Sequence, residues 1–276
     1  MVDRPVFDHV AVAVHHWSDG FPTFIEELGG GWCRGGVAVD FAPCQLAFEH
    51  GMKVELLEPP ADGGGFVARF LDGRGPGPHH ITFKVPELDA FIRGCSELGL
   101  ELLPDHIDVP DRREAFVHPK ASGLGTLLQA IQADESFDRT TSAPVGFPIP
   151  EGPAHALAWV GLSVRDLAAA LKLFGRVLGG RVTIDGSTDR GSWALVEWEP
   201  GRRLLVLGPM AARSIGRNGG ALGVDHLLFT PPGAALPVPW SLGDAVPLTS
   251  GDAIGARSVL FGSWSGSRRP ARRRRG

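Results

Sequence analysis

An internal repeat, opening each time on a strand that carries a histidine, is the feature of this sequence that most constrains its fold. Residues 7–14 alternate between a valine face and a less apolar face that carries His9. Residues 79–85 follow a Gly/Pro run and alternate in the same way, with His80 on the less apolar face. A repeated unit constrains the architecture more firmly than the propensity of any single segment.

Each of these strands begins a unit with the order strand, helix and three strands. The first unit continues with apolar residues at helical spacing, a glycine stop and three strand-like runs, over residues 21–28, 29–31, 36–41, 45–49 and 52–58. The second unit follows a connector, residues 61–78, that holds one short apolar segment. It repeats the order with a helical stripe and three strands, over residues 88–98, 101–103, 115–118 and 126–132.

A third unit begins at residues 156–164, and a fourth begins at residues 224–229 but has a proline-rich run in place of its helix. We therefore predict an α+β fold of paired βαβββ modules that form a cup-shaped mixed sheet, with four modules of which the last is degenerate. The expected layout is a pair of modules, a linker, a second and degenerate pair, and an Arg-rich disordered tail, at residues 1–135, 136–153, 154–263 and 264–276.

Composition indicates a globular protein: 43% of the residues are hydrophobic and 21% are charged. No apolar run is long enough to span a membrane and the start of the chain does not resemble a signal peptide, so we expect a cytoplasmic protein. Three widely spaced cysteines argue against a disulfide framework or a cysteine-based zinc site. The net charge of -4, which already includes the arginines of the tail, argues against a nucleic-acid partner.

Equivalent positions in the first two units suggest a metal site. His9 and His80 open the two units, and Glu55 and Gln129 stand on their last strands. If the units pair about a pseudo-twofold axis, these four side chains converge, and nitrogen and oxygen ligands of this kind suit a divalent metal ion. The alternative is that both histidines are ordinary hydrogen-bonded residues at strand starts.

Several phrases of the first half resemble a known family: DHVAVAV, VELLEP, GPGPHHITFKV and VHPKASGLGTLLQ, at residues 8–14, 54–59, 75–85 and 117–129. Residues 7–132 resemble the vicinal oxygen chelate superfamily, which includes glyoxalases, bleomycin resistance proteins and dioxygenases. Within it they are most similar to methylmalonyl-CoA epimerases. The resemblance covers slightly under half of the chain.

The resemblance implies that His9, Glu55, His80 and Gln129 hold a divalent ion, whose identity stays open among cobalt, zinc, manganese, nickel and iron. Gln129 departs from the family, which has a glutamate there, so either carboxylate and amide have changed places with Glu55 or the site binds metal weakly. A divalent ion that chelates two substrate oxygens would stabilise the enolate left when a proton is removed next to a thioester.

Epimerisation needs a base on each face of the substrate, and Glu55 and Glu49 are the candidates. His118 and Lys120 lie in the HPK phrase and could meet a phosphate or carboxylate of an acyl-CoA, the expected type of small-molecule partner. Glu114 is expected to be an exposed charge. His79 is expected to point away from His80, because side chains alternate along a strand. The oligomeric state stays open.

Units three and four do not repeat the site: Trp159 stands where His9 stands, Leu205 where Glu55 stands, and His226 alone is retained. The leading prediction is therefore a metal-dependent isomerase or lyase that works in the first half through an enolate, like an acyl-CoA epimerase. The alternatives are an extradiol-type dioxygenase, a glyoxalase-like lyase, or a non-catalytic small-molecule binding or resistance protein.

Overall fold

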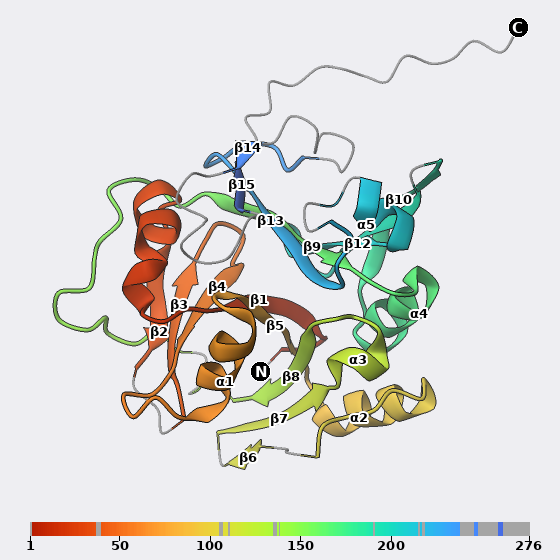
Figure 1. Cartoon of the computed structure of the whole chain (residues 1–276), viewed down its shortest axis with the longest axis horizontal. Helices are drawn as coiled ribbons and strands as arrows, with labels where there is room; N and C mark the ends of the chain where they lie inside the picture. The colour runs from red at the N-terminus through yellow and green to blue at the C-terminus, as the bar shows by residue number, and fades with distance from the viewer. Residues whose placement is uncertain are drawn as a thin grey trace, which may run out of the picture.

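The computed structural model describes residues 2–36, 40–104, 107–109, 111–134, 137, 139–189, 191–214, 216, 219–237, 246–247 and 259–261. The Arg-rich tail lies outside the described residues. Two mixed sheets, one from each half of the chain, make up the fold (Figure 1). The α+β architecture of paired modules predicted from the repeat is confirmed.

The first sheet has eight strands in the order β2-β3-β4-β1-β5-β8-β7-β6. Its strands are β1 (Val6–Ala13), β2 (Gly31–Gly35), β3 (Ala42–Ala47), β4 (Lys53–Glu58), β5 (Gly77–Lys84), β6 (Ile107–Val109), β7 (Arg112–Val117) and β8 (Leu127–Ala133). The helices of this half are η1 (Trp17–Asp19), η2 (Pro22–Glu27), α1 (Gly65–Arg74), α2 (Leu88–Glu97) and α3 (Pro119–Ser122). The two opening strands, β1 and β5, pair antiparallel at the centre of the sheet.

The second sheet has seven described strands in the order β10-β11-β12-β9-β13-β15-β14. They are β9 (Ala156–Ser163), β10 (Arg181–Thr188), β11 (Gly191–Glu197), β12 (Arg203–Leu207), β13 (Gly223–Thr230), β14 (Val246–Pro247) and β15 (Val259–Phe261). Its helices are α4 (Leu167–Lys172), η3 (Leu173–Val177) and α5 (Pro209–Ser214). No helix stands between β13 and β14 among the described residues, as the proline-rich run predicts.

Two details differ from the sequence-based expectations, and a third can be compared only in part. The strand predicted at residues 36–41 includes residues 37–39, which lie outside the described residues, and β2 forms at Gly31–Gly35, directly after the glycine stop. The strand predicted at residues 101–103 is reduced to one bridge, between Leu102 and Val117, and β6 pairs with β7 instead. The apolar segment of the connector forms α1, which packs on the face of the sheet that carries His9.

Each of the four opening strands has a β-bulge at the same place. The register between β1 and β5 skips Asp8 on one strand and His79 on the other. Between β9 and β13 it skips Ala158 and Asp225. A bulge leaves one extra residue unpaired and re-aims its side chain. The skipped residue of each strand therefore does not point to the opposite face of the sheet, as simple alternation would require. Asp8 lies beside His9, His79 beside His80, and Asp225 beside His226.

One hydrophobic core joins the two halves. The apolar faces of the opening strands of the first half are turned toward the second half, and those of the second half toward the first. Trp198 of the second half contacts Phe7 and Phe83 of the first, with ring centroids 5.8 and 4.9 Å apart. Phe48 and Phe229 meet in the same way at 5.0 Å. The histidine faces of both sheets are thereby turned away from this core. No described helix is long and apolar enough to cross a membrane.

Candidate metal centre

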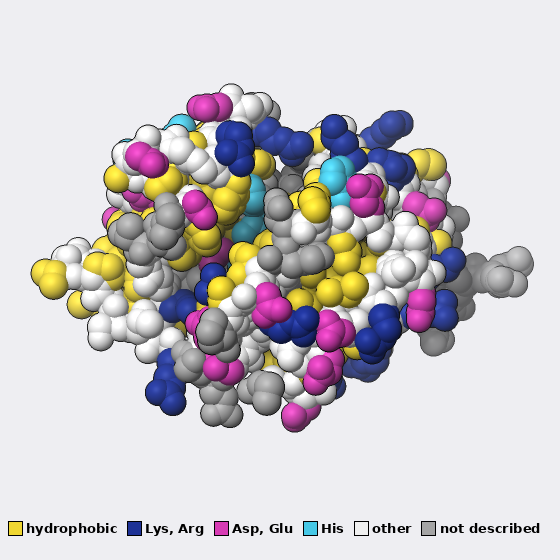
Figure 2. Space-filling model, turned by 90° about the horizontal axis from the view of Figure 1, so that it is seen from below, with side chains coloured by type: hydrophobic (Ala, Val, Ile, Leu, Met, Phe, Trp, Pro, Cys, Tyr) yellow, Lys and Arg dark blue, Asp and Glu magenta, His cyan; other side chains and the backbone are white. Residues whose placement is uncertain are grey.

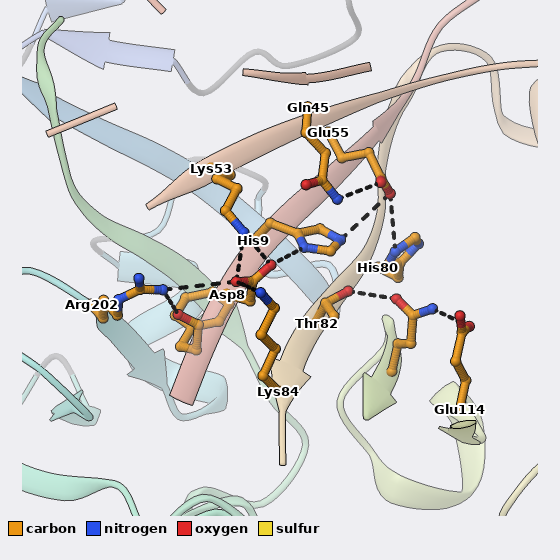
Figure 3. A network of polar contacts seen from close by, with 12 residues as sticks. Asp8, His9, Gln45, Lys53, Glu55, His80, Thr82, Lys84, Glu114 and Arg202 are labelled. Atoms are coloured by element: carbon orange, nitrogen blue, oxygen red, sulfur yellow. Dashed lines mark hydrogen bonds and ion pairs between the residues drawn. The ribbon is translucent and has the colours of Figure 1, made fainter. Parts of the chain in front are cut away.

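Three side chains of the central strands of the first sheet converge: His9 from β1, Glu55 from β4 and His80 from β5 (Figure 3). Glu55 and His80 both lie opposite Ala11 on the strands that flank β1, and His9 precedes Ala11 by two residues on the same face. The methyl side chain at Ala11 leaves room between them. One ligand atom from each residue lies within 4.8 Å of the others.

The orientation of the three groups fits a cation. His9 Nε2 and His80 Nε2 lie 3.5 and 3.7 Å from Glu55 Oε2, too far for good hydrogen bonds. Both nitrogens are buried and have no hydrogen-bond partner. Buried polar atoms without a partner are rare and require an explanation. Two imidazole nitrogens and a carboxylate oxygen, all turned toward one point, are the donor set of a divalent metal site.

Asp8 fixes the ring of His9. The bulge in β1 turns Asp8 onto the side of its neighbour, and Asp8 Oδ2 lies 2.8 Å from His9 Nδ1. Burial by itself would raise the pKa of Asp8, yet Lys53, which donates to both carboxylate oxygens at 2.7 and 2.8 Å, holds it well below its usual range. The ionised carboxylate accepts the Nδ1 proton, so the lone pair of His9 is on Nε2, toward Glu55.

The charges of the cluster shift its pKa values. Burial raises the pKa of Glu55, but the imidazoles of His9 and His80 and a hydrogen bond from Gln45 outweigh it and lower the pKa to about 2. Burial lowers the pKa of His9, but Glu55 and Asp8 raise it above its usual value. Burial, followed by the neighbouring ring of His79, lowers the pKa of His80 well below its usual value. At neutral pH the carboxylate is ionised and His80 is neutral, as metal binding requires, whereas the raised pKa of His9 means that a metal ion has to displace a proton from this ring.

His79 does not point away from His80, contrary to the expectation from simple alternation. The bulge in β5 places the two rings on the same side of the strand, with 2.8 Å between their Nδ1 atoms. His79 also contacts Phe66 and Phe70 of α1. Burial lowers the pKa of His79 to about 4. A neutral His79 can accept the Nδ1 proton of His80, which leaves His80 Nε2 free to act as a ligand.

Gln129, the fourth expected ligand, lies next to this cluster but is held by other groups. Thr82 donates to its Oε1 at 2.7 Å, and its Nε2 donates to Glu114 at 2.7 Å. An ionised carboxylate only accepts hydrogen bonds, so Glu114 fixes which end of the amide is nitrogen and turns the oxygen toward Thr82. Gln129 also raises the pKa of His80, although by less than burial lowers it.

Glu114 and Gln45 are site residues that the sequence reasoning missed. Glu114 was expected to be exposed, but it is only 4% exposed and its other oxygen accepts from Arg112 Nε at 2.6 Å. Its neighbour Ala115 belongs to the hydrophobic core, so the alternation along β7 turns Glu114 toward Gln129. Gln45 lies opposite Glu55 on β3 and donates to its Oε1 at 2.9 Å. This bond leaves Glu55 Oε2 facing the imidazoles.

Glu49, the second candidate base, is not part of the cluster of His9, Glu55 and His80. It lies just after β3, where it forms a bridge with Ala156, the first residue of β9. Its carboxylate accepts hydrogen bonds of 3.2 and 3.1 Å from the backbone N–H of Gly233. Glu49 therefore takes part in the contact between the halves, because the chain turns toward the second sheet at this point.

His118 and Lys120 stand at the N-terminus of α3. His118 Nδ1 accepts from the backbone N–H groups of Lys120 and Ala121 at 3.2 and 3.3 Å. The side chain of Lys120 is exposed, and its carbonyl accepts from Arg165 of the second half at 3.1 Å. The face of the molecule in Figure 2 is hollowed near its middle, where histidines are visible among hydrophobic side chains and Lys and Arg side chains gather along the upper edge.

Among the described residues of the second half, no equivalent cluster is found. Gly161 takes the position of Ala11, with Leu205 and His226 on either side of it. Trp159 Nε1 donates to His226 Nε2 at 2.8 Å, while His226 Nδ1 meets Asp225 at 2.7 Å. Both nitrogens of His226 therefore have partners, and no atom of its ring is left for a metal ion.

Comparison with known proteins assigns the first half to a family. Residues 8–116 match the model of the glyoxalase/bleomycin resistance protein/dioxygenase superfamily and form a domain of that superfamily. No curated protein sequence matches the chain.

Similar solved structures cover about half of the chain. Methylmalonyl-CoA epimerase from Mycobacterium tuberculosis is 25% identical, with 50% of this chain and 95% of that one covered and a TM-score of 0.43. A hypothetical protein from Bacillus halodurans C-125 is 23% identical, with 51% and 99% covered and a TM-score of 0.43. A variant of the Streptomyces coelicolor methylmalonyl-CoA epimerase, in complex with 2-nitronate-propionyl-CoA, is 23% identical, with 46% and 96% covered and a TM-score of 0.39.

Proposed function

Since its first half belongs to the glyoxalase/bleomycin resistance protein/dioxygenase superfamily, we propose that this protein is a divalent-metal-dependent isomerase that moves a proton next to a thioester, as a methylmalonyl-CoA epimerase does. The observation that carries the proposal is the pair of buried imidazole nitrogens, His9 Nε2 and His80 Nε2, that lack partners and face Glu55 Oε2. The phrases of the sequence that resemble epimerases support the choice of reaction.

In this proposal His9, Glu55 and His80 hold the ion, and Gln129 is the fourth ligand through its oxygen. The ion, when bound, would polarise the substrate carbonyl and stabilise the enolate. Asp8 and His79 keep the lone pairs of the two imidazoles directed at the site. Gln45 donates a hydrogen bond to Glu55 Oε1. Glu55 Oε2 would therefore be the oxygen that coordinates the ion and exchanges a proton with the substrate.

The substrate is proposed to be an acyl-CoA whose phosphates meet His118 and Lys120. Both residues belong to the phrase that resembles epimerases, and the exposed ammonium group of Lys120 is available to a phosphate. Glu49 has no role in this proposal, because its carboxylate is bonded to Gly233 at the contact between the halves. Glu55 is therefore the one base that the proposal assigns, and removal and return of the α-proton is the step that it accounts for.

Two measurements test the function. Purified protein loaded with cobalt or zinc should retain about one equivalent after desalting; less than about a tenth of an equivalent would rule out the metal site. Methylmalonyl-CoA incubated with the loaded protein in heavy water should gain deuterium at the α-carbon. Absence of deuterium, with the metal present, would reject the epimerase reaction while leaving the metal site in place.

A non-catalytic small-molecule binding protein is the second candidate, and the state of Gln129 favours it. Both ends of this amide already have strong partners, Thr82 and Glu114, so a metal ion would lack the carboxylate that the family supplies. Metal analysis separates the two candidates, because the binding protein would retain no ion and would still bind its ligand.

A further inference from the structure

A pocket of about 510 Å³ lies between the two halves, beside the histidine pair of β5. Phe70 and His79 of the first half line it, together with Leu222 and Val224 of the second half. His79 contacts His80, so one imidazole ring separates this seam pocket from the candidate metal centre. Its volume is in the range of small-molecule binding sites.

Close packing between the halves fixes the outer wall of the seam pocket. Gly125, in the loop before β8, has a φ of +69°, and a Cβ added there would lie 2.4 Å from Leu222 Cβ and 2.6 Å from Gly223 N. No side chain larger than hydrogen fits between the two loops. The segment of the second half that begins at Leu222 is thus held directly against the first half.

The lining of the seam pocket suits an anion with an apolar body. Arg74 is its one residue with a permanent charge, and no acidic side chain lines it among the described residues. His118 Nδ1 accepts two backbone N–H groups, so in the neutral ring the proton is on Nε2 and can be donated to a ligand. Leu222 is 39% exposed, which leaves an apolar surface open to the pocket.

We propose that the second half forms part of the substrate site, and that the seam pocket takes the non-reacting, phosphate-bearing arm of an acyl thioester. The apolar part of the arm lies against Leu222 and Val224, and Arg74 of the pocket lining meets its phosphates in addition to His118 and Lys120, which the proposed function already assigns to them. This inference rests on the proposed function for the identity of the ligand. It gives the second half, which lacks a metal cluster of its own among its described residues, a role in substrate selection.

Binding of coenzyme A to the full-length protein, measured by titration calorimetry, tests the seam pocket directly. Leu222→Trp fills the pocket and is expected to weaken binding at least about tenfold. Val182→Trp is the matched control, because Val182 is a comparably exposed apolar side chain of the second half, on β10, and does not line the pocket. Wild-type protein that binds no coenzyme A, or Leu222→Trp that binds it as the wild type does, overturns the inference.

A second pair of variants covers the case in which Leu222→Trp fails to fold. Arg74→Glu replaces an exposed cation at the end of α1 and is expected to weaken binding of coenzyme A about tenfold, because it turns an attraction for phosphate into a repulsion. Arg69→Glu makes the same change on the same helix outside the pocket and is expected to have little effect. Equal affinities of the two variants would overturn the inference.

Deuterium exchange on two substrates separates this inference from the proposed function. The N-acetylcysteamine thioester of methylmalonate lacks the arm, so Leu222→Trp should exchange it as fast as the wild type. With methylmalonyl-CoA the KM of Leu222→Trp should rise at least about tenfold. Exchange that is equally efficient on both substrates overturns the seam pocket and leaves the function standing. Exchange absent from every protein, with coenzyme A binding still lost in Leu222→Trp, overturns the function and leaves the seam pocket standing.

Discussion

The two halves of the chain use the same backbone device with opposite results. In both, a bulge sets an extra residue beside the site position of each opening strand, and in both an aspartate bonds the Nδ1 of the following histidine: Asp8 with His9, and Asp225 with His226. In the first half, His9 Nε2 and His80 Nε2 have no hydrogen-bond partner. In the second half Trp159 donates to Nε2, and apolar side chains fill the remaining space.

The comparison shows that the backbone sets the direction of the imidazole ring. The residue on the neighbouring strand, His9 in the first half and Trp159 in the second, then determines whether the Nε2 of His80 or His226 is free to bind a ligand. The change from His9 to Trp159 supplies a donor, and the change from Glu55 to Leu205 removes the charge. Gly161 then makes room, because a Cβ there would lie 2.3 Å from the ring of His226. In the second half the same backbone geometry surrounds a packed interior.

The largest effect is expected from breaking the closed arrangement of the second half. Trp159→Ala should lower the free energy of unfolding by about 3–5 kcal/mol, because Trp159 is fully buried and its loss leaves a cavity. Urea denaturation followed by circular dichroism measures the change. Trp159→Phe retains most of the volume and should cost about 1–3 kcal/mol, since it leaves His226 Nε2 without its donor. A loss below 1 kcal/mol in Trp159→Ala would contradict the packed arrangement.

In the first half, His80→Ala should lower the affinity for cobalt or zinc by more than about 100-fold, because it removes a ligand. The loss of a ligand costs more than the loss of a supporting residue, which is about 10- to 100-fold. Calorimetric titration of the metal-free protein measures this. His226→Ala in the second half should leave the affinity unchanged, and an equal loss in both variants would mean that the metal binds elsewhere.

Each half has an aspartate that bonds the Nδ1 of the following histidine. In the first half, Asp8→Asn should lower metal affinity about 10- to 100-fold. The amide is neutral and accepts the Nδ1 proton of His9 less strongly, so the lone pair on Nε2 is less basic. The d–d absorption of bound cobalt should change as well, because the ring is held less firmly. Asp225→Asn should alter stability and leave cobalt binding as it is in the wild type.

The stability of the protein should depend on pH through Glu55 of the first half, whereas its counterpart Leu205 in the second half does not titrate. The pKa of Glu55 is about 2 in the folded protein, against an ordinary value of 4.5, so between these pH values the unfolded chain binds more protons. Glu55 therefore contributes stability that is present above pH 4.5 and is lost as the pH falls toward 2. The contribution amounts to at most about 1.4 kcal/mol per pH unit.

Urea denaturation of the metal-free protein between pH 5 and pH 3 measures this slope. Glu55→Gln should show a shallower loss of stability than the wild type over the same range, because a neutral amide does not titrate. Equal slopes for the two proteins would mean that the pKa of Glu55 is not lowered by the imidazoles.

The smallest effect is expected at the edge of the site, from Glu114→Gln. An amide in place of the carboxylate can donate as well as accept, so it no longer determines which end of Gln129 is oxygen. Metal affinity should fall by a few-fold, up to about tenfold. Glu101→Gln, a change of the same type at an exposed position, is the matched control. An unchanged affinity would show that Gln129 does not contribute an oxygen to the ion.

The repeat in the sequence was enough to predict the order of elements and the meeting of His9, Glu55 and His80. His9 and His80 occupy equivalent positions on opening strands that pair edge to edge in one sheet, and Glu55 lies on the strand on the other side of β1, so the symmetry of the units brings the three together. The register of the strands bears this out, since Glu55 and His80 both lie opposite Ala11.

The contacts around these residues could not be predicted in the same way. Strict alternation places Asp8 and His79 on the far side of their strands, and only the bulges return them to the site. The burial of Glu114 depends on Gln129 and Arg112, and the place of Glu49 depends on β9 of the other half. Such contacts are set by tertiary packing, for which local pattern gives no signal.

The aromatic core shared by the halves has a practical consequence for anyone who wishes to shorten this protein. Trp198 covers Phe83, which lies within the matched residues 8–116, and Phe7, which directly precedes them. A fragment that ends before β9 would expose the face that carries both rings to water as one large apolar patch, and patches of that kind drive aggregation. The matched domain therefore depends for its solubility on Trp198, which lies 82 positions beyond its last residue, 116.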